Sequence, residues 1–219
     1  NKIYIISGDG CMMEGITHEA ASFAGHQKLD NIIVFYDSNM ISIEGSTEIA
    51  FTEDVGKRFE AYGWRVIKCA NANDYAQVEK ALEEAKKSDG RPTLIIGSTT
   101  IGFGAPNKAG KASSHGEPLG VEELAAAKKA LGFPEQEFYV PQEVRDMIDA
   151  RVAELEKEEA AWDAKFQQFV EANPDKAAQL SKMMNREVPA NLLEELVAAA
   201  PVEKPVATRA SSGTILQKA

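Results

Sequence analysis

The stretch IISGDGCMMEG, residues 5–15, joins an apolar run to two glycines that flank an aspartate. Gly8 and Gly10 let the backbone turn sharply at the end of a strand and let a ligand approach it closely. The Asp9 carboxylate between them is a hard oxygen ligand of the kind that Mg²⁺ or Ca²⁺ prefers. The alternative is that Asp9 is an ordinary turn residue that caps the helix after it.

Short apolar strands alternate with helical patterns over the first hundred residues. The sequence predicts strands at 2–7, 31–37, 65–69 and 92–99, and helices at 14–28, 53–63 and 74–88. This alternation is typical of βαβ units and a largely parallel sheet. The strands are almost continuously apolar, as expected when helices cover both faces of a sheet. We therefore expect an α/β fold, with a parallel sheet and helices on both faces, followed by a helical extension.

The composition and the periodic pattern of the sequence change after residue 100. Residues 99–120, TTIGFGAPNKAGKASSHGEPLG, are rich in glycine, lysine and small side chains. A loop of this length without structure of its own is usually functional. Helical patterns then run from 121 to about 200 and include a long charged helix near 141–172. We expect three aromatic residues of that helix to form a packing stripe: Trp162, Phe166 and Phe169.

Composition and charge exclude several classes of function. The net charge of −10 argues against non-specific nucleic-acid binding, which needs a basic face. We find neither an apolar run long enough to span a membrane nor a secretory signal. Cys11 and Cys69 are too few for a disulfide framework, which fits a reducing cytoplasm. Because the chain opens on Asn1 and enters a strand at once, we expect a piece of a longer protein.

Two of the predicted strand ends carry side chains suited to a metal ion. Asp9 ends the first strand, and Asn39 lies in YDSNMISIEG, residues 36–45, after the second. Because ligands gather at the carboxyl ends of parallel strands, we expect these two side chains to share a site. Their oxygens suit Mg²⁺ or Ca²⁺, with other positions left to water and phosphate. We therefore predict a cation that bridges the protein to a diphosphate. Asn39 as a simple turn former is the alternative.

These motifs resemble those of a known family. GDGCMMEG followed by YDSNMISIEG resembles the thiamine-diphosphate motif, which opens with Gly-Asp-Gly and closes downstream with an asparagine. Further motifs extend the resemblance, and the whole chain from Asn1 to Ala219 resembles transketolases. These motifs are EAYGW (60–64), TTIGFGAPNKAG (99–110), SHGEPLG (114–120), VPQEV (140–144) and ATR (207–209).

The resemblance implies a division of the chain into three parts. Residues 1–120 match the second half of the diphosphate-binding domain, which has the thiamine-diphosphate-binding fold. Residues 121–200 match a helical extension of that domain. Residues 201–219 match a linker and the start of the pyrimidine-binding domain.

The resemblance also implies which residues hold the cofactor. Asp9, Asn39 and the carbonyl of Ile41 match the metal ligands. Gly10 and Asn39 match contacts to the cofactor diphosphate. Cys11 lies beside this motif without an evident partner base, so we expect a buried small residue there.

Further residues match contacts to the substrate and to a second subunit. His115 matches a catalytic histidine that touches both cofactor and sugar, and Arg209 matches an arginine that binds the sugar's phosphate. Glu14 and Glu19 match carboxylates near the dimer interface. An exposed loop histidine and a solvated helix face are the alternatives for His115 and for the two glutamates. Relatives often carry another histidine a few residues before the one that matches His115, where this chain has Lys111-Ala112-Ser113, so the loop departs here from the family's pattern.

The activity that the resemblance implies is that of transketolase in the pentose phosphate pathway. A two-carbon ketol group passes reversibly from a ketose phosphate to an aldose phosphate, with thiamine diphosphate and Mg²⁺ or Ca²⁺ as cofactors. The implied enzyme is a cytoplasmic homodimer with its site at the subunit interface, and neither nucleic acid nor membrane is a partner.

The family's activating glutamate is expected beyond Ala219, so we expect the 219-residue chain alone to be inactive. The alternatives are another thiamine-diphosphate enzyme, such as a 2-oxoacid dehydrogenase component or deoxyxylulose-phosphate synthase, and a non-catalytic structural fragment.

Overall fold

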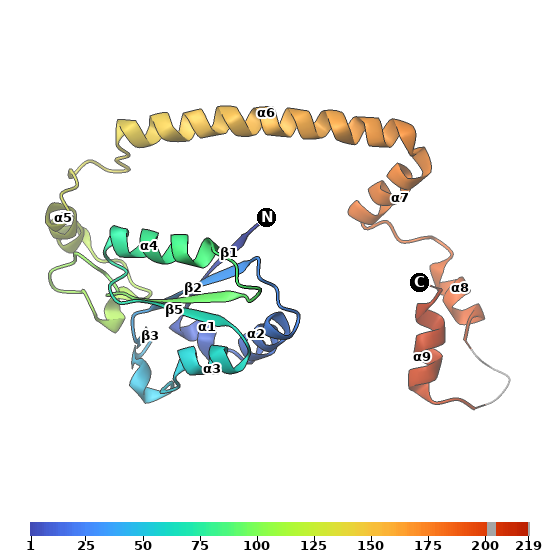
Figure 1. Ribbon diagram of the computed structural model, residues 1–219, viewed down its shortest axis with the longest axis horizontal. Helices are drawn as coiled ribbons and strands as arrows, with labels where there is room; N and C mark the ends of the chain where they lie inside the picture. Colours follow the sequence, from blue (N-terminus) through green and yellow to red (C-terminus); the bar gives the residue numbers. More distant parts are fainter. Residues whose placement is uncertain (201–204, 219) are drawn as a thin grey trace. The chain divides into compact units, whose positions relative to one another are not determined.

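The computed structural model describes residues 1–200 and 205–218. The chain divides into two compact units, Asn1–Tyr139 and Val140–Ala219. The first unit is an α/β domain and the second is helical (Figure 1). The boundary between these units differs in kind from the predicted domain boundaries at residues 120 and 200, which stay a prediction. Residues 201–204 of the predicted linker lie outside the described residues.

The first unit is built on a four-stranded parallel sheet in the order β1-β2-β6-β5. Its strands are β1 (Ile3–Gly8), β2 (Ile32–Ser38), β5 (Arg65–Cys69) and β6 (Thr93–Ser98). Gly8 pairs with Asp37, so β1 and β2 end level with each other. A short antiparallel pair, β3 (Ile41–Ser42) with β4 (Gly45–Ser46), follows β2 and was not predicted from the sequence.

Helices cover both faces of this sheet (Figure 1). They are α1 (Asp9–Met13), α2 (Gly15–His26) and α3 (Val55–Ala61) on one face and α4 (Tyr75–Lys86) on the other. Alternate residues of β2 face opposite sides, because Val34 packs with α2 and α3 while Ile33 packs with α4. The predicted α/β fold with a parallel sheet covered on both faces is confirmed.

Aromatic packing joins α2 and α3 below the sheet. Phe59 is 2% exposed, and its ring meets the Trp64 ring edge to face with centroids 5.0 Å apart. The buried Trp64 indole donates to the carbonyl of Ala21 at 2.8 Å. These contacts fix α2 against α3 and the residues that follow it.

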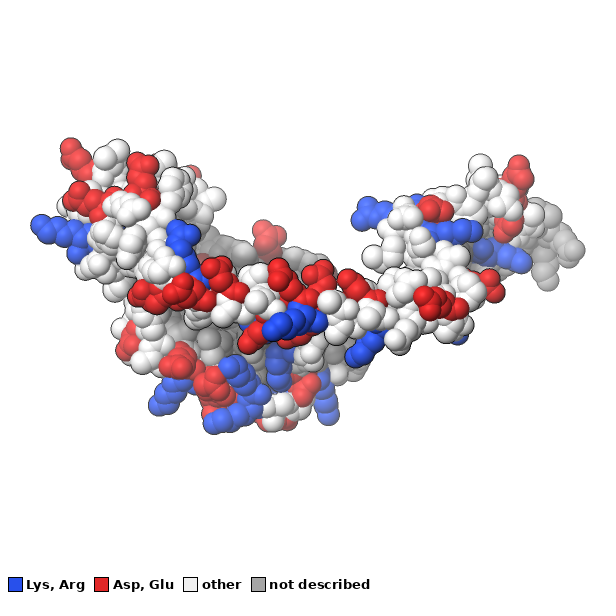
Figure 2. Space-filling model, turned by 90° about the horizontal axis from the view of Figure 1, so that it is seen from above, with Lys and Arg blue, Asp and Glu red and all other residues white. Residues whose placement is uncertain are grey.

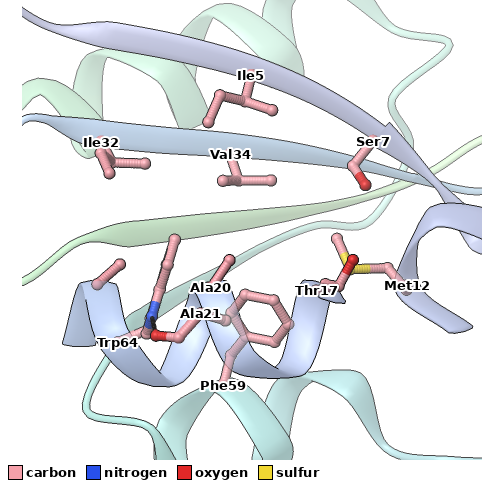
Figure 3. Close-up of a pocket in the computed structure, with 11 residues that line it drawn as sticks. Ile5, Ser7, Met12, Thr17, Ala20, Ala21, Ile32, Val34, Phe59 and Trp64 are labelled. Carbon is pink, nitrogen blue, oxygen red and sulfur yellow. Dashed lines mark hydrogen bonds between the residues drawn. The ribbon is translucent and has the colours of Figure 1, made fainter. Parts of the chain in front are cut away.

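The helix predicted at residues 14–28 is confirmed as α2, but its apolar residues do not all face the core. Ala24 is buried, whereas Ile16 and Phe23 are 67% and 61% exposed. The helix turns Ala21 and Ala24 toward the strands instead. A cavity of about 200 Å³ remains between α2 and the edge strand β1. Figure 3 shows Ile5 and Val34 of the sheet on one side of this cavity and the alanines of α2 on the other.

The remaining elements are helical. They are the 3₁₀ turns η1 (Thr47–Ile49) and η2 (Ala112–Ser114), then α5 (Val121–Ala130), α6 (Gln142–Ala172), α7 (Pro174–Met184), α8 (Leu192–Ala198) and α9 (Thr208–Leu216). Acidic and basic side chains are interspersed on the face of α6 in view in Figure 2. Trp162 and Phe166 stack with centroids 5.1 Å apart and line a groove against α7. Among the described helices, none combines the length and the apolar character that a membrane crossing requires.

Candidate functional site

Asp9 joins the ends of the two neighbouring strands β1 and β2. Its side chain follows β1 directly and is only 3% exposed. Its Oδ1 accepts a hydrogen bond from the Tyr36 hydroxyl at 2.6 Å, and its Oδ2 accepts one from the Asn39 backbone N–H at 3.2 Å. Each carboxylate oxygen has two lone pairs, so each keeps one for a further partner. The carboxylate is therefore held in place and still able to bind a cation.

The loop after β2 makes a tight turn at Asn39. Asn39 Oδ1 accepts a hydrogen bond from the Ile41 backbone N–H at 3.0 Å. Met40 between them has a φ of 61°, in the left-handed region that a methionine rarely adopts. A left-handed residue costs roughly 1–2 kcal/mol, part of which the side-chain turn of asparagine offsets. Strain of this kind concentrates at ligand sites, and here it lies between two predicted metal ligands.

Tyr36 is a site residue that the sequence reasoning missed. Burial raises the pKa of its hydroxyl far above the ordinary value, and the hydrogen bond to Asp9 raises it further. The hydroxyl therefore remains a proton donor to the carboxylate at any physiological pH. Its position gave a signal, because alternation along β2 puts Tyr36 on the same face as Val34, beside the carboxyl end of the strand.

Gly10 leaves open space beside Asp9. A Cβ added there would meet nothing within 4 Å, whereas a Cβ at Gly25 would lie 1.8 Å from the Tyr62 carbonyl oxygen. Packing within the chain therefore explains glycine at position 25 but not at position 10. Close approach of a ligand to the backbone is a reason for glycine at position 10. Cys11, expected to be buried, is exposed because α1 turns Met12 toward the sheet instead.

The loop that carries His115 is tied to the same edge of the sheet. The Thr99 N–H donates to the Ser38 carbonyl at 3.2 Å, and the Thr99 hydroxyl donates to the Asp37 carboxylate. Further along, the Ser114 hydroxyl donates to the Lys108 carbonyl at 2.6 Å. His115 follows η2 and is exposed. The loop thus begins at the end of β6, is hydrogen-bonded there to the end of β2, and presents its histidine to solvent.

Glu123 of α5 fastens the middle of this loop. Its Oε1 accepts from the backbone N–H groups of Asn107 and Lys108 at 2.6 and 3.0 Å, and its Oε2 accepts from Asn107 Nδ2 at 2.9 Å. These hydrogen bonds, the Asn107 side chain first, hold the pKa of the Glu123 carboxyl below its usual range. Sequence reasoning missed this contact, which depends on how the loop folds back on α5.

The other predicted site residues lie on exposed positions. Glu14 precedes α2 and Glu19 lies within it, and both are exposed. Arg209 is exposed in α9, in the second unit. Among the described residues, no three His, Cys, Asp or Glu side chains gather as a metal site. A cation at Asp9 would therefore need oxygens from Asn39, the main chain and a ligand as well.

A buried carboxylate and an amide lie at the carboxyl ends of parallel strands, where α/β domains of the nucleotide- and cofactor-binding class hold their ligands. Comparison with known proteins identifies the family of this domain, because residues 1–189 match the family described as "Transketolase, thiamine diphosphate binding domain". The chain belongs to the transketolase family. The alternative of a different thiamine-diphosphate enzyme is set aside by this match.

Individual relatives agree with the family. "Transketolase 1" of Vibrio parahaemolyticus is 49% identical over 192 residues, which are 88% of this chain and 29% of that protein. The crystal structure of transketolase from Campylobacter jejuni matches with a TM-score of 0.77 and 42% identity, over 100% of this chain and 33% of that chain. A Pichia stipitis transketolase complex with sedoheptulose 7-phosphate matches with a TM-score of 0.79 and 38% identity, over 99% and 32%. The chain thus spans about a third of the length of these relatives.

Proposed function

We propose that this chain provides the diphosphate-binding part of a transketolase, which transfers a two-carbon ketol group between sugar phosphates in the pentose phosphate pathway. The observation that carries the proposal is the Asp9 carboxylate, held by Tyr36 and by the Asn39 backbone where β1 and β2 end. Structures of the Pichia stipitis relative are complexes with xylulose 5-phosphate, sedoheptulose 7-phosphate and fructose 6-phosphate, which supports ketose phosphates as substrates.

Three residues would hold a divalent cation in this proposal. They are Asp9, Asn39 and, through its carbonyl, Ile41, with Mg²⁺ or Ca²⁺ as the ion. The donor set fits, because hard oxygens converge on one edge of the sheet and each Asp9 oxygen keeps a lone pair. Gly10 and Asn39 would contact the diphosphate of thiamine diphosphate. When bound, this cofactor supplies the carbanion chemistry of ketol transfer.

The chain's own residues orient the cofactor and handle charge around it. Tyr36 holds the Asp9 carboxylate in one orientation through its hydroxyl. His115 stands exposed on its loop and would exchange protons with the sugar, as a histidine near neutral pH does. Arg209 would bind the sugar phosphate by a bidentate contact. Glu14 and Glu19, exposed around the start of α2, would lie at the interface of a homodimer.

The division of labour along the chain is also part of the proposal. Residues 1–120 would bind the diphosphate, residues 121–200 would extend that domain, and residues 201–219 would lead into the pyrimidine-binding domain. The cytoplasm is the proposed location, and both cysteines are free, as a reducing compartment requires. The resemblance implies that the family's activating glutamate lies beyond Ala219, so we propose that the 219 residues alone do not transfer ketol groups.

Calorimetric titration of the 219-residue chain tests the proposal. The titrants are thiamine diphosphate with Mg²⁺, thiamine diphosphate with EDTA, and thiamine, which lacks the diphosphate. We expect weak binding in the first titration only, because the cation joins the diphosphate to Asp9. Equal binding of thiamine, or no binding of thiamine diphosphate at millimolar concentration, would contradict the proposal.

A further inference from the structure

Arg58 of α3 places a largely buried guanidinium among three helices. Its side chain is 11% exposed. Nη2 donates to the Met12 carbonyl of α1 at 2.9 Å, and Nη1 contacts His18 Nε2 of α2 at 2.8 Å. Nη1 also donates to Glu53 Oε2 at 2.6 Å, which supplies the opposite charge. A single side chain of α3 therefore holds both α1 and α2.

The hydrogen bonds of this cluster fix the form of His18. A guanidinium can only donate, so Nε2 of His18 must accept from Arg58. Nδ1 of the same ring contacts the Tyr62 hydroxyl at 3.1 Å. The guanidinium carbon also lies 5.8 Å from the Phe51 ring centroid and 5.7 Å from that of Phe59. The cluster thus holds the guanidinium in a single orientation.

The cluster carries a free-energy cost. Arg58 Nε is buried and has no hydrogen-bond partner within the described part of the chain. A buried charge with a polar atom left unpaired is destabilising relative to an apolar side chain of similar size. Stability alone is therefore a weak reason for an arginine at this position. The groups that its hydrogen bonds hold in place explain it better.

The contact with Met12 acts on the helix that carries Asp9. α1 has five residues, so its last carbonyls lack partners within the helix. The Cys11 carbonyl accepts from the Thr17 hydroxyl at 2.6 Å, and the Met12 carbonyl accepts from Arg58. Asp9, at the other end of α1, is held by Tyr36 and Asn39. Both ends of this short helix are therefore fixed by residues distant in the sequence.

We propose that Arg58 is a positioning residue for the cofactor site. By holding the Met12 carbonyl, it keeps α1 in the orientation that presents Asp9 and Gly10 to a cation-bound diphosphate. Arg58 does not itself touch the ligand. This inference rests on the proposed function for the identity of the ligand, but the orientation of α1 is measurable without any ligand.

Arg65 provides a matched control. Its side chain is 17% exposed, and Nη1 donates to the carbonyls of Glu84 and Lys87 at 3.2 and 2.7 Å. Nη2 forms an ion pair with the Glu84 carboxylate. Arg65 thus joins β5 to α4, on the face of the sheet opposite α1. Substituting it removes a comparable set of hydrogen bonds without touching the helix that carries Asp9.

The experiment compares Arg58→Lys with Arg65→Lys in the full chain. Hydrogen exchange of the amides of residues 9–14, without ligand, reports how firmly α1 is held in its orientation. Calorimetry with thiamine diphosphate and Mg²⁺ reports the site, at a temperature where urea titration shows both variants folded. We expect Arg58→Lys to speed exchange in residues 9–14 and to weaken binding on the order of tenfold, as loss of outer supports of metal sites does. Arg65→Lys leaves both unchanged. If Arg58→Lys does not fold, Arg58→Gln replaces it, because glutamine removes the guanidinium that holds the Met12 carbonyl and buries no charge.

The two measurements separate this inference from the proposed function. Unchanged exchange in residues 9–14 overturns the positioning role, whatever the ligand. Faster exchange with unchanged binding overturns the link between α1 and the site. Absence of thiamine diphosphate binding to the unsubstituted chain overturns the proposed function. It also overturns the role of Arg58 in positioning α1 for that ligand. Faster exchange together with weaker binding, in Arg58→Lys and not in Arg65→Lys, supports the inference.

Discussion

Replacing Tyr36 with phenylalanine tests the hydrogen bond that holds the candidate metal ligand. Tyr36 and Asp9 are each 3% exposed, and their hydrogen bond is 2.6 Å long. The variant keeps the ring and removes only the hydroxyl, so the packing is preserved. A hydrogen bond to a charged group contributes about 1.5–3 kcal/mol, and the buried Asp9 oxygen is left without this donor. We therefore expect Tyr36→Phe to lower the free energy of unfolding by about 2 kcal/mol.

Urea titration at pH 7, followed by the fluorescence of buried Trp64, measures this loss. Tyr4→Phe is the control, because Tyr4 lies on the neighbouring strand β1 and is 53% exposed. Removing the Tyr4 hydroxyl should change the unfolding free energy by no more than about 0.5 kcal/mol. If the two variants lose equal stability, the hydroxyl of Tyr36 does not hold the carboxylate as the structure indicates.

The unsubstituted protein and Tyr36→Phe together give a pH test of the raised pKa of Tyr36. The hydroxyl stays protonated in the folded chain above pH ~10, where an unfolded tyrosine releases its proton. Ionisation then favours the unfolded state of the unsubstituted protein by up to about 1.4 kcal/mol per pH unit. The stability difference from Tyr36→Phe is thus fully present below pH ~10 and shrinks as pH rises further. A difference that stays constant from pH 9 to 11 would refute the burial of this hydroxyl.

Two further pairs of variants test the site and its loop. Gly10→Ala should leave thermal stability unchanged or slightly raised and weaken thiamine diphosphate binding, whereas Gly25→Ala should prevent folding because its Cβ meets backbone at 1.8 Å. Weakened folding in Gly10→Ala would contradict the open space seen there. Glu123→Ala should speed hydrogen exchange in residues 105–116, and Glu122→Ala should not. Because the pKa of Glu123 is lowered by its loop contacts, that protection should be present at neutral pH and fade as pH falls through the folded-state pKa.

The sequence predicted the strands and helices of the first unit well, because apolar runs and helical spacing are local properties. It also predicted that Asp9 and Asn39 follow neighbouring strand ends, which the pairing of Gly8 with Asp37 confirms. It missed β3 and β4 because two-residue strands leave no periodic pattern. They follow Met40, whose left-handed backbone is a conformation that a methionine does not signal.

Other features were beyond sequence reasoning because they depend on orientation in space. Ile16 and Phe23 have helical spacing, but which face of α2 meets the sheet is decided by the close approach that Ala21 and Ala24 allow. The contact between His18 and Arg58 joins residues 40 positions apart. No local pattern in the sequence marks such a pair, so the cluster around the Met12 carbonyl emerges only from the fold.

The central claim is that Asp9 and Asn39 bind one divalent cation that holds a diphosphate. The most direct measurement is a crystal structure of the chain grown with Mn²⁺ and thiamine diphosphate, with the cation located by its anomalous scattering. We expect one peak within roughly 2.0–2.3 Å of an Asp9 carboxylate oxygen and of Asn39 Oδ1, with the Ile41 carbonyl, diphosphate oxygens and water completing an octahedron. An anomalous peak elsewhere, with Asp9 still bonded only to Tyr36 and Asn39, would contradict the claim.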